Sequence, residues 1–139
     1  MGRILAIDYG RKRTGLAVTD ILRITANPLL TIETNQLMIW LADYFAKEPV
    51  DEVVIGHPTQ LNGEDSESMV YIRPFINTFR KAFPEMKLTE YDERFTSTLA
   101  HRAMIDGGMK KMQRRDKAVV DKLAACILLE DYLESSLNC

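Results

Sequence analysis

The chain has few cysteines, no long hydrophobic run and little net charge, and each shortage excludes a class of protein. Its two cysteines, Cys126 and Cys139, provide neither a disulfide framework nor a zinc-binding spacing. No apolar stretch approaches the roughly 20 residues that a membrane-spanning helix needs, and the N-terminus lacks a signal-peptide pattern. The formal net charge of -2 argues against binding of a polyanion over the whole surface, but it allows a local basic patch. We therefore expect a soluble cytoplasmic protein.

Internal repeats, low-complexity tracts and an obvious linker are also absent. A chain of 139 residues that is 46% hydrophobic can bury most of its apolar surface in one core. We therefore expect a single domain over residues 1–139. Cys126 lies in an apolar stretch with helical character, so we expect its thiol to be buried.

The spacing of apolar residues predicts an alternation of strands and helices. Residues 3–9 alternate with a strand period that places Asp8 on the same face as Ile4 and Ala6, and both faces are apolar, which indicates a central strand. Further strands are expected near residues 16–19, 29–32, 53–55 and 88–92, and helices near residues 37–45, 69–79, 96–106 and 118–137.

The order of these elements predicts the fold class. Short connections between the first three strands favour antiparallel pairing, and helices then alternate with the remaining strands. We expect an α/β fold with a five-stranded mixed sheet, three strands antiparallel and then two parallel, flanked by helices. This order is typical of the ribonuclease H-like arrangement.

Two details of the predicted helices can be tested against a structure. Pro74 lies within the second helical pattern and predicts either a kink or a late helix start. In the last helix, the apolar stripe is expected to contain Val120, Leu123, Ala124, Ile127 and Leu128.

Acidic residues fall at the ends of two predicted strands. Asp8 closes the first strand beside a turn that contains Gly10, and a carboxylate in such a place is typical of a metal or phosphate site. A strand that simply ends in a polar turn is the alternative. Asp92 and Glu93 close the fifth strand, and because side chains alternate along a strand, normally only one of them can face the same site as Asp8. We choose Glu93 and keep Asp92 as the alternative.

A third acid, Asp121, lies early in the last helix, beside the apolar stripe and close to the small residues Ala124 and Ala125. An uncompensated charge at such a border is costly, so Asp121 needs a partner. The interaction of a carboxylate with the helix dipole, or an ion pair with Lys117 or Lys122, would also account for it.

Asp8, Glu93 and Asp121 together form a donor set that suits a divalent cation. Magnesium prefers hard oxygen ligands and keeps water or substrate phosphate in its other coordination positions. Two such ions about 4 Å apart can activate a water molecule and stabilise the leaving oxygen in phosphodiester hydrolysis. We therefore expect one or two Mg²⁺ ions bound by these three residues, which would be the catalytic residues.

Basic residues lie beside two of the three acids. Such residues contact phosphates without reading sequence, so they favour a polyanionic substrate at this site. A solvated loop and a charged helix start are the plainer alternatives. The residues in question are Arg11, Lys12 and Arg13, which follow Asp8, and Lys110, Lys111, Arg114, Arg115 and Lys117, which precede Asp121.

Four segments of the chain resemble the motifs of the YqgF family, also called RuvX. They are DYGRKRTGLAVTD (8–20), VVIGHPTQLNGEDS (53–66), YDERFTST (91–98) and KAVVDKLAACILLEDYL (117–133), and they occur in the family's order over nearly the whole chain. Members of this family are described as Holliday junction resolvases by fold and as nucleases of pre-16S ribosomal RNA by proposed role.

The resemblance implies a ribonuclease H-like fold, a cytoplasmic location and dependence on magnesium or manganese. It also implies a nuclease that matures the 5′ end of small-subunit ribosomal RNA, with ribosome-associated factors as candidate partners. Asp8, Glu93 and Asp121 match the three acids of the family's motifs. Arg94 and Thr96 match the polar residues after the second acid, where they would contact phosphate or support the site. His57 and Ser97 depart from the pattern; a structural hydrogen bond is the plainer role for His57, and substrate contact the other.

Two classes of nucleotide-binding protein fit the sequence less well than the nuclease. The spacing from Gly10 to Gly15 imitates a P-loop, but Leu16 occupies the position of the required lysine. Actin-like and sugar-kinase-like ATPases bind nucleotide between two lobes, and this chain has the length of one. A Holliday junction resolvase and a non-catalytic module that binds RNA or ribosomes remain open. Because no dimer seam is evident, we expect a monomer or a weak dimer, and RNA is slightly favoured over a DNA junction.

Overall fold

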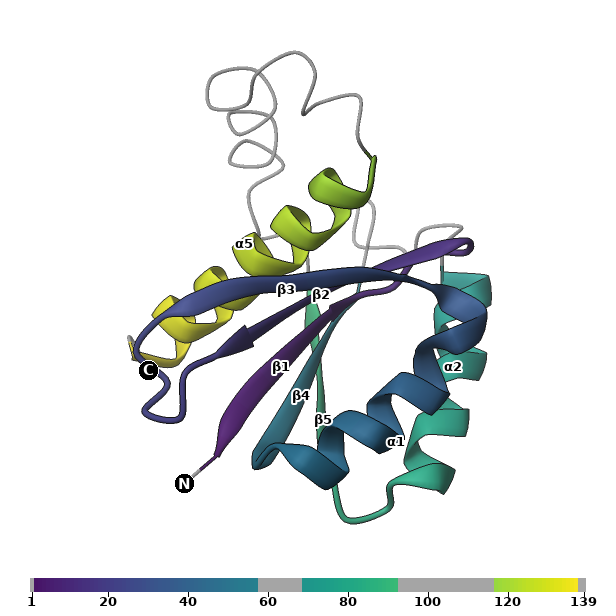
Figure 1. Cartoon of the computed structure of the whole chain (residues 1–139), viewed down its shortest axis with the longest axis horizontal. Helices are drawn as coiled ribbons and strands as arrows, with labels where there is room; N and C mark the ends of the chain where they lie inside the picture. The colour runs from purple at the N-terminus through teal and green to yellow at the C-terminus, as the bar shows by residue number, and fades with distance from the viewer. Residues whose placement is uncertain (1, 58–68, 93–116, 138–139) are drawn as a thin grey trace.

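A computed structural model of the protein describes residues 2–57, 69–92 and 117–137. Within these residues, a mixed sheet is covered by helices on both faces (Figure 1). The elements in chain order are β1 (Arg3–Asp8), β2 (Arg13–Thr19), β3 (Ala26–Glu33), a short 3₁₀ helix (Thr34–Gln36), α1 (Leu37–Lys47), β4 (Val50–His57), α2 (Met69–Ala82), β5 (Lys87–Asp92) and α5 (Lys117–Leu137).

The sheet has the strand order β3-β2-β1-β4-β5, which confirms the predicted α/β fold. The hairpin strands β1, β2 and β3 pair antiparallel, whereas β1, β4 and β5 pair parallel. β1 is the central strand, and its Ile7 is paired with Leu16 on one side and Ile55 on the other. This arrangement is consistent with the ribonuclease H-like order expected from the sequence.

Each face of the sheet carries its own hydrophobic core, because side chains alternate along the strands. On one face, Leu5 and Ile7 pack with buried residues of α1 and α2. On the other face, Ile4 and Ala6 pack with α5, which contacts β1, β2 and β3. Figure 1 shows α5 crossing this second face, from the end of the sheet where β1 finishes to the end where the N-terminus lies.

The structure corrects several boundaries. β2 begins at Arg13, three residues before the predicted start, and β3 begins at Ala26 and includes Pro28. Proline is tolerated there because β3 is an edge strand whose register with β2 shifts beside Pro28. The alternative prediction of a late start for the second helix is wrong, since α2 begins at Met69 and continues through Pro74. The helix expected at residues 96–106 lies outside the described residues.

The buried side of α5 differs from the predicted stripe. Leu128 is buried as expected, but Leu123, Ala124 and Ile127 are only partly buried. Most of this stretch is apolar, so the sequence does not single out one face. The residues that actually form the core are Ala125, Cys126, Leu128 and Leu129, which also confirms the buried thiol. In the described part of the chain, no helix has the length and apolar character required to span a membrane.

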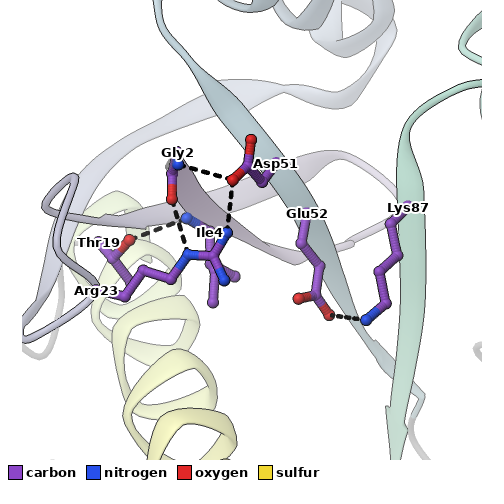
Figure 2. A network of polar contacts seen from close by, with 7 residues as sticks. All are labelled: Gly2, Ile4, Thr19, Arg23, Asp51, Glu52 and Lys87. Carbon is purple, nitrogen blue, oxygen red and sulfur yellow. Dashed lines mark hydrogen bonds and ion pairs between the residues drawn. The ribbon is translucent and has the colours of Figure 1, made fainter.

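Polar contacts hold the other end of the sheet, opposite the end of β1 (Figure 2). Arg23, in the β2–β3 turn, adopts a left-handed conformation with φ of 59°. Its guanidinium donates to the Gly2 carbonyl oxygen (2.8 Å) and to Asp51 on β4 (2.7 Å). The Gly2 amide donates to the same Asp51 carboxylate (2.7 Å), so the turn, the chain start and β4 are tied together.

Candidate functional site

The carboxyl ends of three parallel strands meet at one edge of the sheet. β1 ends at Asp8, β4 at His57 and β5 at Asp92, and His57 is paired with Asp92 in the register. In α/β sheets, ligands bind outside the carboxyl ends of the strands. The structure therefore places the first predicted acid, Asp8, at the edge where a site is expected.

Asp8 is partly buried and belongs to the α5 side of the sheet. It follows Ile4 and Ala6 in the alternation of β1, and both of these residues pack against α5. Its Cα partner on β2 is Gly15, which has no side chain beyond its α-carbon to cover the carboxylate.

Asp121 lies in the first turns of α5, at the end of the helix nearest this edge (Figure 1). Residue 121 is four residues before Ala125, which is buried. Positions four apart lie on the same face of a helix. The helix that carries this position packs on the same side of the sheet as Ile4 and Ala6. The side chains of Asp121 and of the alternative ligand Asp92 are not among those described.

Glu93, Arg94 and Thr96 lie outside the described residues, as do four of the five basic residues that precede Asp121. Lys117, the fifth, is the first residue of α5, and its side chain is not described. Within the described ranges, no group of three or more His, Cys, Asp or Glu residues is arranged to hold a metal ion. The complete acidic triad thus stays a prediction.

The loop that follows Asp8 is held in a defined conformation. A Cβ atom on Gly10 would lie 2.1 Å from the Arg13 carbonyl oxygen, so the turn requires glycine. The Thr34 hydroxyl donates to the Gly10 carbonyl oxygen (2.7 Å), and the Thr34 amide donates to the Lys12 carbonyl oxygen (3.0 Å). The hydroxyl groups of Thr34 and fully buried Thr14 are 2.8 Å apart. Thr34 therefore anchors the basic loop to the rest of the fold.

Aromatic contacts fix the same loop against α2. The Tyr9 ring stacks on Phe75 with a centroid distance of 4.7 Å. The Arg11 guanidinium lies 5.0 Å from the ring centroid of Tyr71, one helical turn before Phe75. Burial raises the pKa of the Tyr9 phenol, so this group stays protonated at neutral pH and is no candidate general base. The sequence patterns did not indicate Thr34 or Tyr71, because no local spacing links either residue to the loop.

The three basic residues of the loop border a surface hollow. Its volume is about 440 Å³, and Glu33 and Asn35 complete its lining beside Arg11, Lys12 and Arg13. Of the predicted basic residues, the structure therefore groups the three that directly follow Asp8 around one hollow. It also places one acid, Glu33, among these cations.

Comparisons with known proteins agree with the motifs. Residues 2–135 match the family model described as "RuvX: Holliday junction resolvase". A protein of Phocaeicola vulgatus named "Putative pre-16S rRNA nuclease" is 55% identical over 135 residues, which cover 97% of both chains. A protein of the same name from Bacteroides thetaiotaomicron is 53% identical over 97% of this chain and 98% of its own.

Among solved structures, Archaeoglobus fulgidus Pelota is similar to this chain with a TM-score of 0.47 and 12% identity. The match covers 96% of this chain but only 36% of the Pelota chain. A likeness of this strength carries no argument about fold or function.

Proposed function

Because this chain belongs to the RuvX family, we propose that it is a metal-dependent nuclease that hydrolyses phosphodiester bonds at the 5′ end of pre-16S ribosomal RNA. The match of residues 2–135 to the family supports a nuclease. The names of relatives that are more than half identical support the RNA substrate. The observation that carries the chemistry is the partly buried Asp8 at the carboxyl end of the central strand, next to a fixed basic loop. A cytoplasmic location is part of the proposal.

The chemistry of the proposed donor set fits a magnesium or manganese ion. Asp8, Glu93 and Asp121 would hold it through carboxylate oxygens, which are hard ligands suited to these ions. When bound, one or two such ions would lower the pKa of a water molecule and neutralise charge on the phosphate during cleavage. The position of Asp8 at the end of β1 and that of Asp121 in the first turns of α5 support this proposal.

Glu93 remains our choice over Asp92 for the second ligand. Tyr91 on β5 packs with the α5-side core and against Tyr132, and Asp8 belongs to the same side. Residues two apart in an extended chain share a face, so continuation of β5 would direct position 93 to that side.

The basic residues are proposed to hold the substrate strand. Arg11, Lys12 and Arg13 adjoin Asp8 and surround the hollow beside it, so phosphates of a bound strand would lie close to the acidic edge. We propose the same role for Arg94, Thr96 and the basic residues of the segment from Lys110 to Lys117. These contacts would position the strand without reading its sequence.

Cleavage assays with the Asp8→Asn variant test this function. A pre-16S RNA fragment is incubated with Mg²⁺ or Mn²⁺ and wild-type protein, Asp8→Asn or Asp43→Asn. Asp43 is a matched control because it is a solvent-exposed acid on α1 that pairs with Lys47. Loss of a metal ligand is expected to reduce the cleavage rate by about a hundredfold or more. Asp43→Asn should cleave like wild type, and a folded Asp8→Asn protein with full activity would refute the assignment.

A four-way DNA junction in the same assay tests the second candidate function, which the description of the family model favours. Symmetric cutting of the junction, with no cleavage of the RNA, would identify a Holliday junction resolvase instead. Binding of RNA without cleavage of either substrate, under both metal ions, would identify a non-catalytic RNA-binding module. Cleavage of the RNA alone would support the proposal.

A further inference from the structure

An exposed aromatic ring lies beside the basic loop, in a place that the hydrolytic chemistry does not require. Tyr71 is 43% exposed, although it is a large aromatic residue on the outer side of α2. One side of its ring is covered by the Arg11 guanidinium, 5.0 Å from the ring centroid. Arg11 is itself exposed, so both members of the pair are accessible to solvent beside the basic loop.

Packed aromatic residues lie next to the pair. One turn further along α2, Phe75 is 6% exposed and stacks on Tyr9, which precedes the loop. The loop and α2 are thus joined by two stacked contacts in succession, Tyr9 on Phe75 and Arg11 on Tyr71. Figure 1 shows the β1–β2 turn reaching the first turns of α2, as these contacts require. Side chains that are already fixed by packing lose little conformational freedom when a planar group stacks on them.

We propose that Tyr71 and Arg11 form a stacking site for an unpaired nucleobase of the substrate strand. Proteins that bind single strands combine basic residues along the backbone with aromatic side chains that stack on bases, and arginine adds a cation–π contribution. Here the basic residues Lys12 and Arg13 are in the same loop, and Asp8 is three residues before Arg11. The inference rests on the proposed nuclease function and adds that the strand next to the cleaved bond is single-stranded.

Binding assays without divalent ions separate this site from catalysis. We would titrate three labelled oligonucleotides with protein and follow binding by fluorescence anisotropy at several salt concentrations. They are a single-stranded RNA and a single-stranded DNA of about 12 nucleotides, and the RNA duplex of the same sequence. Tyr71→Ala is expected to weaken single-strand binding by about fivefold or more, with an unchanged salt slope because no charge is lost. Tyr71→Phe should bind like wild type, since the ring remains.

Three controls define the test. Ile39→Ala removes an apolar side chain that is 70% exposed on α1 and should leave binding unchanged. Arg11→Lys keeps the charge but loses the planar group, and it should weaken single-strand binding as well. The duplex, whose bases are already stacked on one another, should bind wild type and Tyr71→Ala equally. Circular dichroism and the Tm establish that each variant is folded.

The outcomes distinguish this site from the nuclease function. Unchanged single-strand binding by Tyr71→Ala, or equal weakening for strand and duplex, would overturn the stacking site even if Asp8→Asn still abolishes cleavage. A wild-type protein that binds none of the three oligonucleotides would overturn both proposals. A similar loss for RNA and DNA supports recognition of the base face alone, and a loss confined to RNA supports the ribosomal RNA substrate.

Discussion

The hydroxyl group of Tyr132 is expected to hold α5 to the sheet. It donates a hydrogen bond to the Glu52 carboxylate on β4, which is only 6% exposed. The Thr89 hydroxyl on β5 donates to the same oxygen over 2.7 Å. Lys87 approaches this carboxylate at 3.8 Å, as Figure 2 shows, but its side chain is 69% exposed, so its contribution is small. Tyr132→Phe therefore leaves a buried carboxylate with one hydroxyl donor fewer.

The expected cost follows from these contacts. A hydrogen bond to a charged group contributes about 1.5–3 kcal/mol, and the ring contact of Tyr132 with Tyr91 is retained in the variant. We expect the free energy of unfolding to fall by about 2 kcal/mol and the Tm by about 7 °C for a chain of this size. Urea and thermal unfolding, followed by circular dichroism at pH 7.5, measure both quantities. Tyr44→Phe, on α1 and distant from Glu52, is the matched control and should change stability much less.

The same group predicts how stability depends on alkaline pH. Burial raises the pKa of Tyr132, and the hydrogen bond to Glu52 raises it further, so the folded protein keeps this proton after the unfolded chain has lost it. The resulting stability is fully present below about pH 10 and is lost as pH rises through the folded-state pKa. Tyr132→Phe should therefore lose less stability than wild type above pH 10. Equal stability at pH 7.5, or equal alkaline slopes, would refute this account of α5.

Two further perturbations test other parts of the fold. Thr34→Val removes the hydroxyl that donates to the Gly10 carbonyl oxygen and contacts Thr14. The free energy of unfolding in urea should therefore fall by about 1–3 kcal/mol, and RNA binding should weaken. Thr34→Ser keeps the hydroxyl and should behave like wild type. Burial, together with Glu130, raises the pKa of the Cys126 thiol to about 11. At pH 8, iodoacetamide should therefore alkylate Cys126 far more slowly in the native protein than in the urea-unfolded protein, as measured on the peptide that contains this residue. Equal alkylation rates would contradict the burial of this thiol.

The central strand and the parallel strands were predictable because their patterns are local and unambiguous. In β1, apolar residues on both faces indicated a strand with neighbours on each side, and the structure pairs it with β2 and β4. The face of α5 was not predictable, since apolar residues surround most of the helix. Contact with the sheet selected Ala125 and Leu129, rather than Leu123 and Ile127, for burial. Likewise, Pro28 fits within β3 only because that strand is an edge strand.

The candidate site, like the fold, was predictable from the sequence only in part. Asp8 was identified from its own strand and turn, and its position at the end of the first strand is confirmed. Thr34 and Tyr71 meet the loop across sequence separations that no periodicity encodes, so only the folded chain shows that they hold it. The pairing of Asp8 with Glu93 and Asp121 remains a prediction from sequence.

If Asp8, Glu93 and Asp121 form the proposed site, its assembly depends on packing at the opposite end of the sheet. Asp8 needs only β1 and its neighbours to reach the edge, whereas Asp121 reaches it only if α5 lies correctly across the second face. The position of α5 is set by Ala125 and Leu129 in the core and by the bond between Tyr132 and Glu52. Because Tyr132 is eleven residues beyond Asp121 and α5 is one continuous helix, a shift at Tyr132 would move Asp121 relative to Asp8. Tyr132→Phe should therefore weaken metal-dependent cleavage more than it weakens RNA binding, since the basic loop is anchored separately by Thr34.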